Sequence, residues 1–449
     1  MAGKRNSAMT NSSVIRSIRR GSAMVALSIG LLAAPAALAK DVIIHAGQLI
    51  DGVSRTTRSN VSILIHDDRI VSVTPGFTEQ AGAEVVDLSK STVLPGLIDT
   101  HVHLLLQLGS GSPMLNQVTR TAYDELLDGT GYARKTLLAG FTSVRDVGGY
   151  TPAIVALKKA VAAGTVTGPR MWVAGSILGP TGGHADFSTG FDEALSKPEW
   201  TDGIIDGPEE AIKVVRAHHR AGVDLIKIVP SGGVASVGDD PHAQLMTDAE
   251  IKAVVETAHT LHMKVAAHAH GAVAVDHASQ IGVDSIEHGS FANDASYKIM
   301  KSNGTYLVPT LIAGDTVVQY AKKHPEVLKP SVAAKALAVG PVMSQNAFNA
   351  YKAGVKMAFG TDAGVYPHGQ NGREFELLVK AGIPAIDAIL MATSAAADLI
   401  GDADDIGTIQ PGRYADIIAT TGNPLTDITE LQRVAFVMKG GQIVKATGQ

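Results

Sequence analysis

The sequence predicts an α/β protein, a (β/α)8 TIM barrel with a small β-sandwich built from both chain ends. Short alternating apolar runs, typical of antiparallel strands, occur at residues 41–90 and return after residue 405. Between them, eight apolar strand-like runs alternate with alanine-rich helical stretches. That alternation is typical of a parallel sheet covered by helices.

The spacing of these eight runs fits a barrel. From His103 on the first run to Asp362 on the eighth, the chain covers about 260 residues, close to the typical barrel size of about 250. We therefore expect a barrel at residues 93–400. The sandwich would consist of an N-terminal part, residues 40–92, and a C-terminal part, residues 401–449.

The first 39 residues read as a targeting segment. Arg16, Arg19 and Arg20 precede the apolar stretch "AMVALSIGLLAAPAALA", which ends in the small-x-small signal Ala37-Leu38-Ala39. The apolar run before Pro35 is too short to span a membrane. The pattern predicts a signal peptide cleaved after Ala39 and a periplasmic or secreted protein without a membrane anchor. The arginine pair leaves twin-arginine export open.

Composition excludes several classes of function. A chain of 449 residues with 45% hydrophobic residues can bury a large core. Its net charge of −5, with no basic run in the body of the chain, gives no electrostatic footprint for nucleic acid. The sequence contains no cysteine, which excludes a thiol nucleophile, a cysteine-ligated metal and a lipoprotein anchor.

Polar side chains interrupt the barrel strands at their C-terminal ends, the end at which barrels carry their active sites. Imidazole and carboxylate groups are ligands of zinc-like metals. A purely structural explanation would need several buried histidines and an aspartate to gather by coincidence at the strand ends of one fold. The residues concerned are His101, His103, His184, Lys227, His268, His270, His288 and Asp362.

Lys227 lies between Ile226 and Ile228, where a charged ammonium is costly to desolvate. Buried lysines are driven towards the neutral amine, with pKa values of about 5 to 6 in documented cases. A neutral amine can take up carbon dioxide, and the resulting carbamate has two oxygens that can each bind a metal. The alternative is a buried carboxylate partner, but Asp224, three residues away, faces the other side of the strand.

The motifs "PGLIDTHVHL", "AAHAHG", "EHGS" and "GTDAG", together with the strand lysine, resemble the amidohydrolase superfamily with a binuclear metal centre. The resemblance covers essentially the whole chain after residue 39. It implies that His101 and His103 hold the more buried metal, with Asp362, and that His268 and His288 hold the more exposed one. It also implies that N6-carboxylated Lys227 bridges the two metals.

The implied reaction is hydrolysis by a hydroxide shared between two divalent cations. Zinc is the metal that we expect, although cobalt and manganese also suit these ligands. Asp362 would take the proton of the attacking water and deliver it to the leaving amine. His184 and His270 are candidates for stabilising the developing oxyanion.

The stretches "GPTGGHAD", "KIVPSGGVAS" and "AAHAHG" are most similar to prolidase-like dipeptidases and carboxypeptidases, a group that includes bacterial ochratoxin amidohydrolases. The resemblance implies cleavage of the amide bond to a C-terminal amino acid in dipeptides or N-acyl amino acids. Ochratoxin A, hydrolysed to ochratoxin alpha and phenylalanine, is one expected substrate. Candidates for binding the substrate carboxylate are Ser231, His242, Tyr366, His368 and Arg373, whereas His218 and His219 read as a solvated helix face.

Three alternatives stay open at this point. A cyclic-amide hydrolase similar to imidazolonepropionase would need one metal and no bridging lysine. A lactonase or phosphotriesterase would use the same centre on an ester. A non-catalytic scaffold would have lost metal ligands, which this chain retains. The group also implies a homo-oligomer, up to an octamer.

Overall fold

The structure is a computed structural model, and it describes residues 41–108, 116, 119–192, 194, 197–324 and 328–447. The predicted signal peptide lies outside these residues. Within them, no helix is long and apolar enough to cross a membrane.

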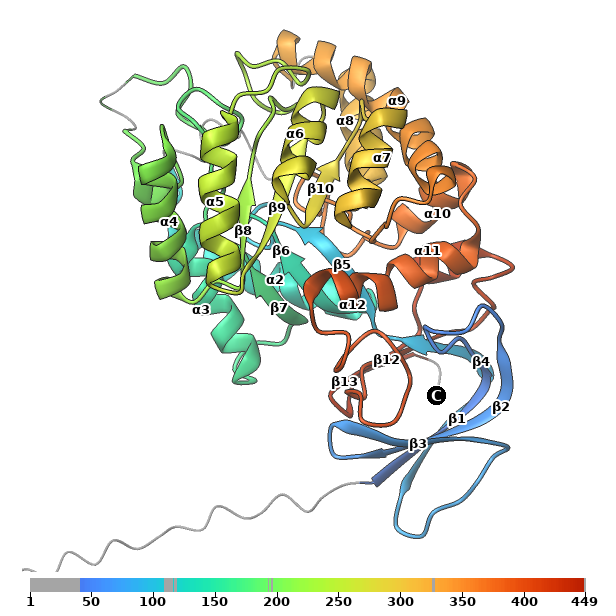
Figure 1. The fold of residues 1–449 in the computed structure, drawn as a ribbon. Coiled ribbons are helices and arrows are strands. Elements are labelled where there is room, and N and C mark those ends of the chain that lie inside the picture. The colour runs from blue at the N-terminus through green and yellow to red at the C-terminus, as the bar shows by residue number, and fades with distance from the viewer. Residues whose placement is uncertain are drawn as a thin grey trace, which may run out of the picture. The chain divides into compact units, whose positions relative to one another are not determined.

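The barrel strands form two parallel sheets. One contains β5 (Leu97–Val102), β6 (Phe141–Asp146) and β7 (Arg170–Val173), and the other contains β8 (Leu225–Ile228), β9 (Lys264–Ala269), β10 (Ser285–His288) and β11 (Tyr306–Val308). Both follow chain order from neighbour to neighbour (Figure 1).

Three isolated parallel bridges close these sheets into a ring. Leu178, beyond β7, pairs with Ile228 of β8. On the other side, Met357 pairs with Leu307 of β11, and Ala363 pairs with Val102 of β5. Residues 357–363 therefore take the place of the eighth strand without forming a regular one, and the predicted (β/α)8 barrel is confirmed.

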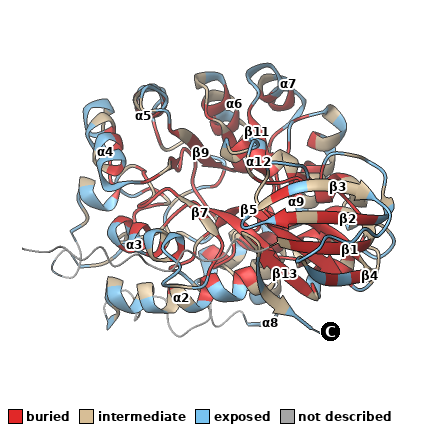
Figure 2. Cartoon of the chain, turned by 90° about the horizontal axis from the view of Figure 1, so that it is seen from below, coloured by how far each residue is buried: buried red, intermediate tan, exposed pale blue. Residues whose placement is uncertain are grey.

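Helices cover the outside of the barrel, and Figure 2 shows that each has a buried and an exposed face. The buried residues are mostly apolar. Side-chain caps start several of them: Thr247 and Glu250 form a capping box at α5, and Asn293 caps α7. Within the described residues, the helices are α2 (Ala122–Leu138), α3 (Thr151–Ala162), α4 (Pro208–Ala221), α5 (Asp248–Thr260), α6 (Ala272–Ile281), α7 (Asp294–Asn303), α8 (Leu311–Lys323), α9 (Pro330–Ala353), α10 (Arg373–Lys380), α11 (Ala385–Met391) and α12 (Ser394–Ile400), with two 3-10 helices, η1 (Trp200–Asp202) and η2 (Ile428–Gln432).

The two chain ends share one seven-stranded mixed sheet, which confirms their predicted pairing. Its order is β14 (Gln442–Ala446), β13 (Phe436–Lys439), β12 (Ile417–Thr420), β4 (Glu84–Pro95), β1 (Asp41–Leu49), β2 (Arg58–His66) and β3 (Arg69–Pro75). Ile70 of β3 exchanges backbone hydrogen bonds with residues 412 and 413, just before β12. The sheet thus folds over a core of its own, which includes Ile44, Ile63 and Phe436.

Ionic contacts attach this sheet to the lower part of the barrel. Arg170 of β7 donates two hydrogen bonds to Asp416, at 2.9 and 3.2 Å, and its guanidinium lies 3.6 Å from the centroid of the Tyr414 ring. Lys439 donates to the carbonyl of Gly168 at 2.7 Å. The residue numbers proposed for the domain boundaries stay predictions.

Phe359 provides a test of barrel packing. Its fully buried ring lies between those of Phe141 and Phe375, with centroids 5.6 and 4.3 Å away. Replacing it by alanine should lower the free energy of unfolding by about 3–5 kcal/mol, because large buried rings leave cavities. Denaturant titration measures this, with Phe187→Ala as control, since Phe187 is 66% exposed. A loss below about 1 kcal/mol for Phe359→Ala would contradict this packing.

Candidate metal centre

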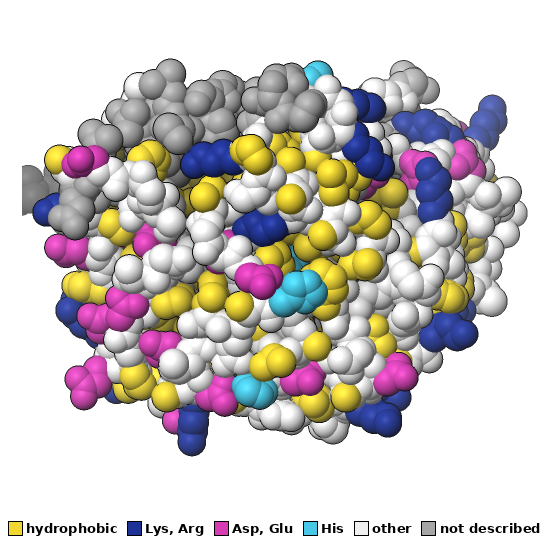
Figure 3. All heavy atoms as spheres, turned by 90° about the horizontal axis from the view of Figure 1, so that it is seen from above, with side chains coloured by type: hydrophobic (Ala, Val, Ile, Leu, Met, Phe, Trp, Pro, Cys, Tyr) yellow, Lys and Arg dark blue, Asp and Glu magenta, His cyan; other side chains and the backbone are white. Residues whose placement is uncertain are grey.

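The residues singled out from the sequence lie at the carboxyl ends of the barrel strands or in the loops just beyond them. His101 belongs to β5, Lys227 to β8, His268 to β9 and His288 to β10. The others follow a strand directly or lie in the loop behind it: His103, His184, His270 and Asp362. On the face seen in Figure 3, a histidine side chain lies near the centre, beside an acidic side chain and among apolar ones.

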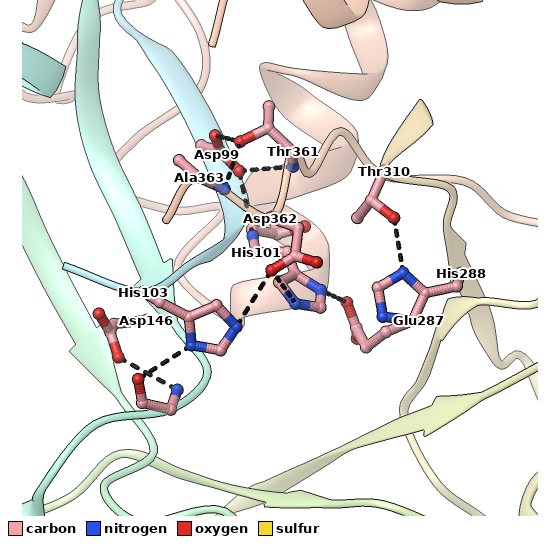
Figure 4. A network of polar contacts seen from close by, with 12 residues as sticks. Asp99, His101, His103, Asp146, Glu287, His288, Thr310, Thr361, Asp362 and Ala363 are labelled. Atoms are coloured by element: carbon pink, nitrogen blue, oxygen red, sulfur yellow. Dashed lines mark hydrogen bonds and ion pairs between the residues drawn. The ribbon is translucent and has the colours of Figure 1, made fainter. Parts of the chain in front are cut away.

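Three of these side chains converge on one point. Oδ1 of Asp362 lies 3.5 Å from Nε2 of His101 and 3.2 Å from Nε2 of His103. One ligand atom from each residue lies within 4.8 Å of the others, and Figure 4 shows the three groups directed at one another. This is the set of ligands that the resemblance implied for the more buried metal.

Hydrogen bonds on the far side of each ring decide where the histidine lone pairs point. Nδ1 of His103 can only donate to the carbonyl of Gly148, 2.9 Å away. Nδ1 of His101 faces the carboxylate of Glu287 at 2.7 Å, which is likewise an acceptor. In the neutral rings, both Nε2 atoms therefore carry lone pairs and direct them at the Asp362 carboxylate, so that a proton or a metal cation between them is needed to satisfy all three groups.

His288 is oriented in the same way. Its Nδ1 lies 2.7 Å from Oγ1 of Thr310, whose hydroxyl donates to the carbonyl of Pro309. The hydroxyl can therefore only accept from His288, which leaves a lone pair on Nε2. His288, Thr310 and Asp362 all have left-handed backbone conformations, with φ of 70°, 52° and 59°. Such strain gathers at functional sites.

His268 lies among the other histidines. Its ring centroid is 4.6 Å from that of His288, 4.7 Å from that of His270 and 4.4 Å from that of His184. Its Nε2 is buried and has no hydrogen-bond partner in the part of the chain that the structure describes. Burial, and then the charges of the neighbouring histidines, lower the pKa of His268, so the ring is neutral.

Lys227 is buried, with 2% of its surface exposed. Among the described residues its ammonium group has no hydrogen bond or ion pair. Burial lowers its pKa to about 8, against the opposing charges of Glu287 and Asp362. Asp224, which the sequence placed on the other face of the strand, instead binds Lys158 at 2.5 Å.

Glu287 and Arg145 form a buried ion pair inside the barrel that the sequence analysis did not single out. Nη2 of Arg145 lies 2.8 Å from Oε1 of Glu287, while the guanidinium also donates to Ser285 and to the carbonyl of Thr100. Burial acts to raise the pKa of Glu287, but Arg145 and His101 hold it below its ordinary value. The sequence did contain a signal for both residues, since Glu287 and Arg145 are charged residues that interrupt apolar strands, just as Lys227 is.

The two candidate substrate histidines are held by hydroxyl groups. Nδ1 of His270 lies 2.7 Å from Oγ of Ser290, and Nδ1 of His184 lies 2.7 Å from Oγ of Ser236. Burial lowers the pKa of His270 to about 3 and that of His184 to about 4. Both rings are neutral at physiological pH.

The loop residues expected to bind a carboxylate differ in their surroundings. Arg373 forms an ion pair with Asp315, and the hydroxyl of Ser231 accepts from the backbone of His270. His368 binds the carbonyl of Leu106 and stacks on Tyr132. The other two are less engaged: His242 is exposed and stacks on Phe291, and the buried hydroxyl of Tyr366 has no partner within the described residues.

The prediction that His218 lies on a solvated face was wrong. Its side chain is 4% exposed, and its ring nitrogens face the carbonyls of Val214 and Ser176 at 3.1 and 3.2 Å. His219, the next residue, is exposed as expected. The two residues point to different sides of α4, which a pair of adjacent histidines does not reveal in sequence.

This donor set fits divalent cations. Neutral imidazoles with their lone pairs directed inward, one carboxylate and a lysine of lowered pKa are groups that ligate zinc and related metals. Burial acts to lower the pKa of His103, yet the contact with Asp362 raises it above its ordinary value. The space between these two groups therefore attracts positive charge.

Comparison with known sequences is decisive at this point, because the amidohydrolase family profile matches residues 92–444. The chain belongs to the amidohydrolase family. Like that family in general, it is a hydrolase that acts on amide bonds, and the family generally depends on two metal ions. The predicted membership of the prolidase-like group is confirmed by the relatives that follow.

Relatives of this amidohydrolase match nearly its whole length. An ochratoxinase from Aspergillus niger is 33% identical over 436 residues, which cover 91% of this chain and 88% of the relative. The structure of a Xaa-Pro dipeptidase with bound methionine has a TM-score of 0.87 and 39% identity, covering 91% of this chain and 100% of the other. A prolidase complexed with N-methylphosphonate-L-proline has a TM-score of 0.84 and 31% identity, with the same coverage.

Glu287 tests how the amidohydrolase orients its ligands. Glu287→Gln should weaken metal affinity about 10- to 100-fold, because groups that fix a ligating histidine contribute that much. Competition with a zinc chelator measures the affinity. Glu374→Gln is the matched control: Glu374 is equally buried, but it binds the backbone of Leu311 and Ile312. Equal affinities for wild type and Glu287→Gln would contradict the role of the ion pair.

Proposed function

We propose that this amidohydrolase cleaves the amide bond to a C-terminal amino acid in dipeptides and N-acyl amino acids, including ochratoxin A. The similarity to an ochratoxinase and to a Xaa-Pro dipeptidase supports this substrate class. The first name gives ochratoxin as the compound acted on, and the second gives a dipeptide that ends in proline. Export with cleavage after Ala39 and assembly into a homo-oligomer belong to the same proposal.

The observation that carries the proposal is the buried amine of Lys227 amid inward-facing histidines. Attack of this amine on carbon dioxide would form an N–C bond and release a proton, leaving an anionic carbamate. His101, His103, Lys227, His268, His288 and Asp362 would then hold two divalent ions, with zinc as the metal. Bound there, the ions supply a hydroxide nucleophile at neutral pH and polarise the substrate carbonyl.

The remaining roles follow from the side chains. Asp362 lies against Nε2 of His101 and His103 at the centre of the site, where it can accept the proton of the attacking water and pass it to the leaving amine. His270 is buried beside His268 and His288, with ring centroids 4.7 and 5.0 Å away. We assign it to the substrate oxygen that becomes negative in the transition state.

A substrate panel read together with metal content tests the proposed function. Purified protein should contain two metals per chain and release the C-terminal amino acid from N-acyl phenylalanines, Xaa-Pro dipeptides and ochratoxin A. Cyclic amides and lactones complete the panel. Cleavage of cyclic amides only, with one metal per chain, would favour the cyclic-amide hydrolase instead.

Lys227→Ala tests the bridging role directly. The variant should lose at least about 100-fold in kcat/KM and part of its metal, because the bridging ligand is gone. Acetate or propionate in solution should restore part of both, by supplying a carboxylate to the vacated space. Lys158→Ala, which disrupts the ion pair with Asp224, is the control and should retain activity. Two metals and full activity in Lys227→Ala would refute the bridge.

A further inference from the structure

His184 is clamped on both faces beside the metal-ligand cluster. One face stacks on His268 with centroids 4.4 Å apart and planes inclined by 27°. The other faces the backbone of Gly233, where an added Cβ would lie 2.2 Å from the His184 ring, so that only glycine fits. The ring plane is therefore fixed, and the remaining freedom concerns which nitrogen carries the proton.

A chain of three residues determines the position of that proton. Oγ of Ser236 lies 2.7 Å from Nδ1 of His184, and also 2.7 and 2.6 Å from the two carboxylate oxygens of Asp239. Lys335 of α9 donates to Oδ1 of Asp239 and to the carbonyl of Ser236, at 2.7 and 2.8 Å. We refer to Ser236, Asp239 and Lys335 as the relay.

The hydrogen bonds of the relay can run in one direction only. Burial would raise the pKa of Asp239, but hydrogen bonds from Lys335 and Ser236 hold it below its ordinary value, so the carboxylate is ionised and can only accept. The single hydroxyl proton of Ser236 then points at Asp239, at 2.6 to 2.7 Å, or at the carbonyl of Gly233, at 3.3 Å, and in either case away from His184. Ser236 in turn accepts from Nδ1–H of His184, and the lone pair of the neutral ring is left on Nε2.

This assignment changes the role expected of His184. Because Nε2 carries a lone pair and no hydrogen, it cannot donate a hydrogen bond to an oxyanion. The neutral ring of His184 therefore does not stabilise an oxyanion. The structure gives Nε2 no hydrogen-bond partner among the described residues, and 20% of the side chain is exposed. An accessible acceptor beside the proposed reaction centre calls for a hydrogen-bond donor on the substrate.

We propose that the relay presents Nε2 of His184 as an acceptor for the N–H of the scissile amide. The inference rests on the proposed function, because an N-acyl amino acid has one N–H at the bond to be cut and an ionised carboxylate that cannot donate. The amidohydrolase would therefore favour secondary amides over Xaa-Pro dipeptides, whose scissile nitrogen carries no hydrogen, and over isosteres that lack it. Ser236, Asp239 and Lys335 are positioning residues, since they act through His184.

Asp239→Asn tests the relay because this substitution reverses the direction of its hydrogen bonds. An asparagine amide can donate to Ser236, which would then donate to Nδ1 of His184 and move the ring proton to Nε2. The probes are an N-acyl-L-phenylalanine and the O-acyl-L-phenyllactate with the same acyl group, in which oxygen replaces the N–H. Asp239→Asn should lower kcat/KM about 10- to 100-fold for the amide, because a site built to bind an N–H is left mismatched. The ester should change by less than about threefold.

Matched variants keep the test decisive. Asp240→Asn changes the adjacent exposed carboxylate, which binds the backbone of His242 outside the relay, and should leave both substrates unchanged. Ser236→Ala should repeat the selective loss on the amide, and Ser236→Thr, which retains the hydroxyl, should restore it. If Asp239→Asn does not fold, the comparison of Ser236→Ala with Ser236→Thr tests the inference in its place.

Other results would overturn the inference. Equal losses of kcat/KM on amide and ester in Asp239→Asn would show that the relay only supports the local structure. An unchanged kcat/KM for the amide would show that the relay has no role in the reaction. A fall below two metals per chain in Asp239→Asn would identify His184 as a metal ligand. Wild-type protein that cleaves neither probe with two metals bound would refute the proposed function and this inference together, whereas the other outcomes refute the inference alone.

Discussion

The candidate site depends on where the Nδ1 protons of its histidines go. The carbonyl of Gly148, the carboxylate of Glu287 and the hydroxyl of Thr310 each accept one such proton, at 2.7 to 2.9 Å. Each bond turns an Nε2 lone pair inward, and together the bonds arrange a group of lone pairs that attracts cations. The same reasoning assigns the proton of His184, although there the acceptor is itself set by an ion pair.

The barrel supplies these acceptors because it brings distant strands together. Glu287 is separated from His101 by 186 residues, yet β10 and β5 both direct side chains into the barrel interior. Arg145 from β6 balances the charge of Glu287. Burial lowers the pKa of Lys227, Glu287 acts to raise it, and Arg145 adds to the lowering. Buried charges of this kind are stable only when paired. Glu287, Arg145 and Lys227 therefore determine the charge of this part of the barrel together.

The sequence was enough to predict the fold and to single out polar residues at the strand ends, because both follow from local patterns, whereas the ligand roles came from the resemblance. Apolar strands alternating with helices predict the barrel, and polar residues at strand ends mark its active face. The eighth strand was predicted from "KMAFGTDAG", although residues 357–363 form only isolated bridges. Glu287, Arg145, Thr310 and the relay were missed because their roles depend on partners that only barrel closure brings into contact. His218 was misassigned because adjacent residues of a helix can face opposite environments.

The central claim is that Lys227, as a carbamate, joins two metal ions. A crystal structure of the zinc-loaded protein, with anomalous diffraction recorded on both sides of the zinc absorption edge, tests it most directly. We predict two anomalous peaks about 3.5 to 4 Å apart, with electron density for a carboxylate group continuous with Nζ of Lys227 between them. A single peak beside His101, His103 and Asp362, with an unmodified lysine, would contradict the account.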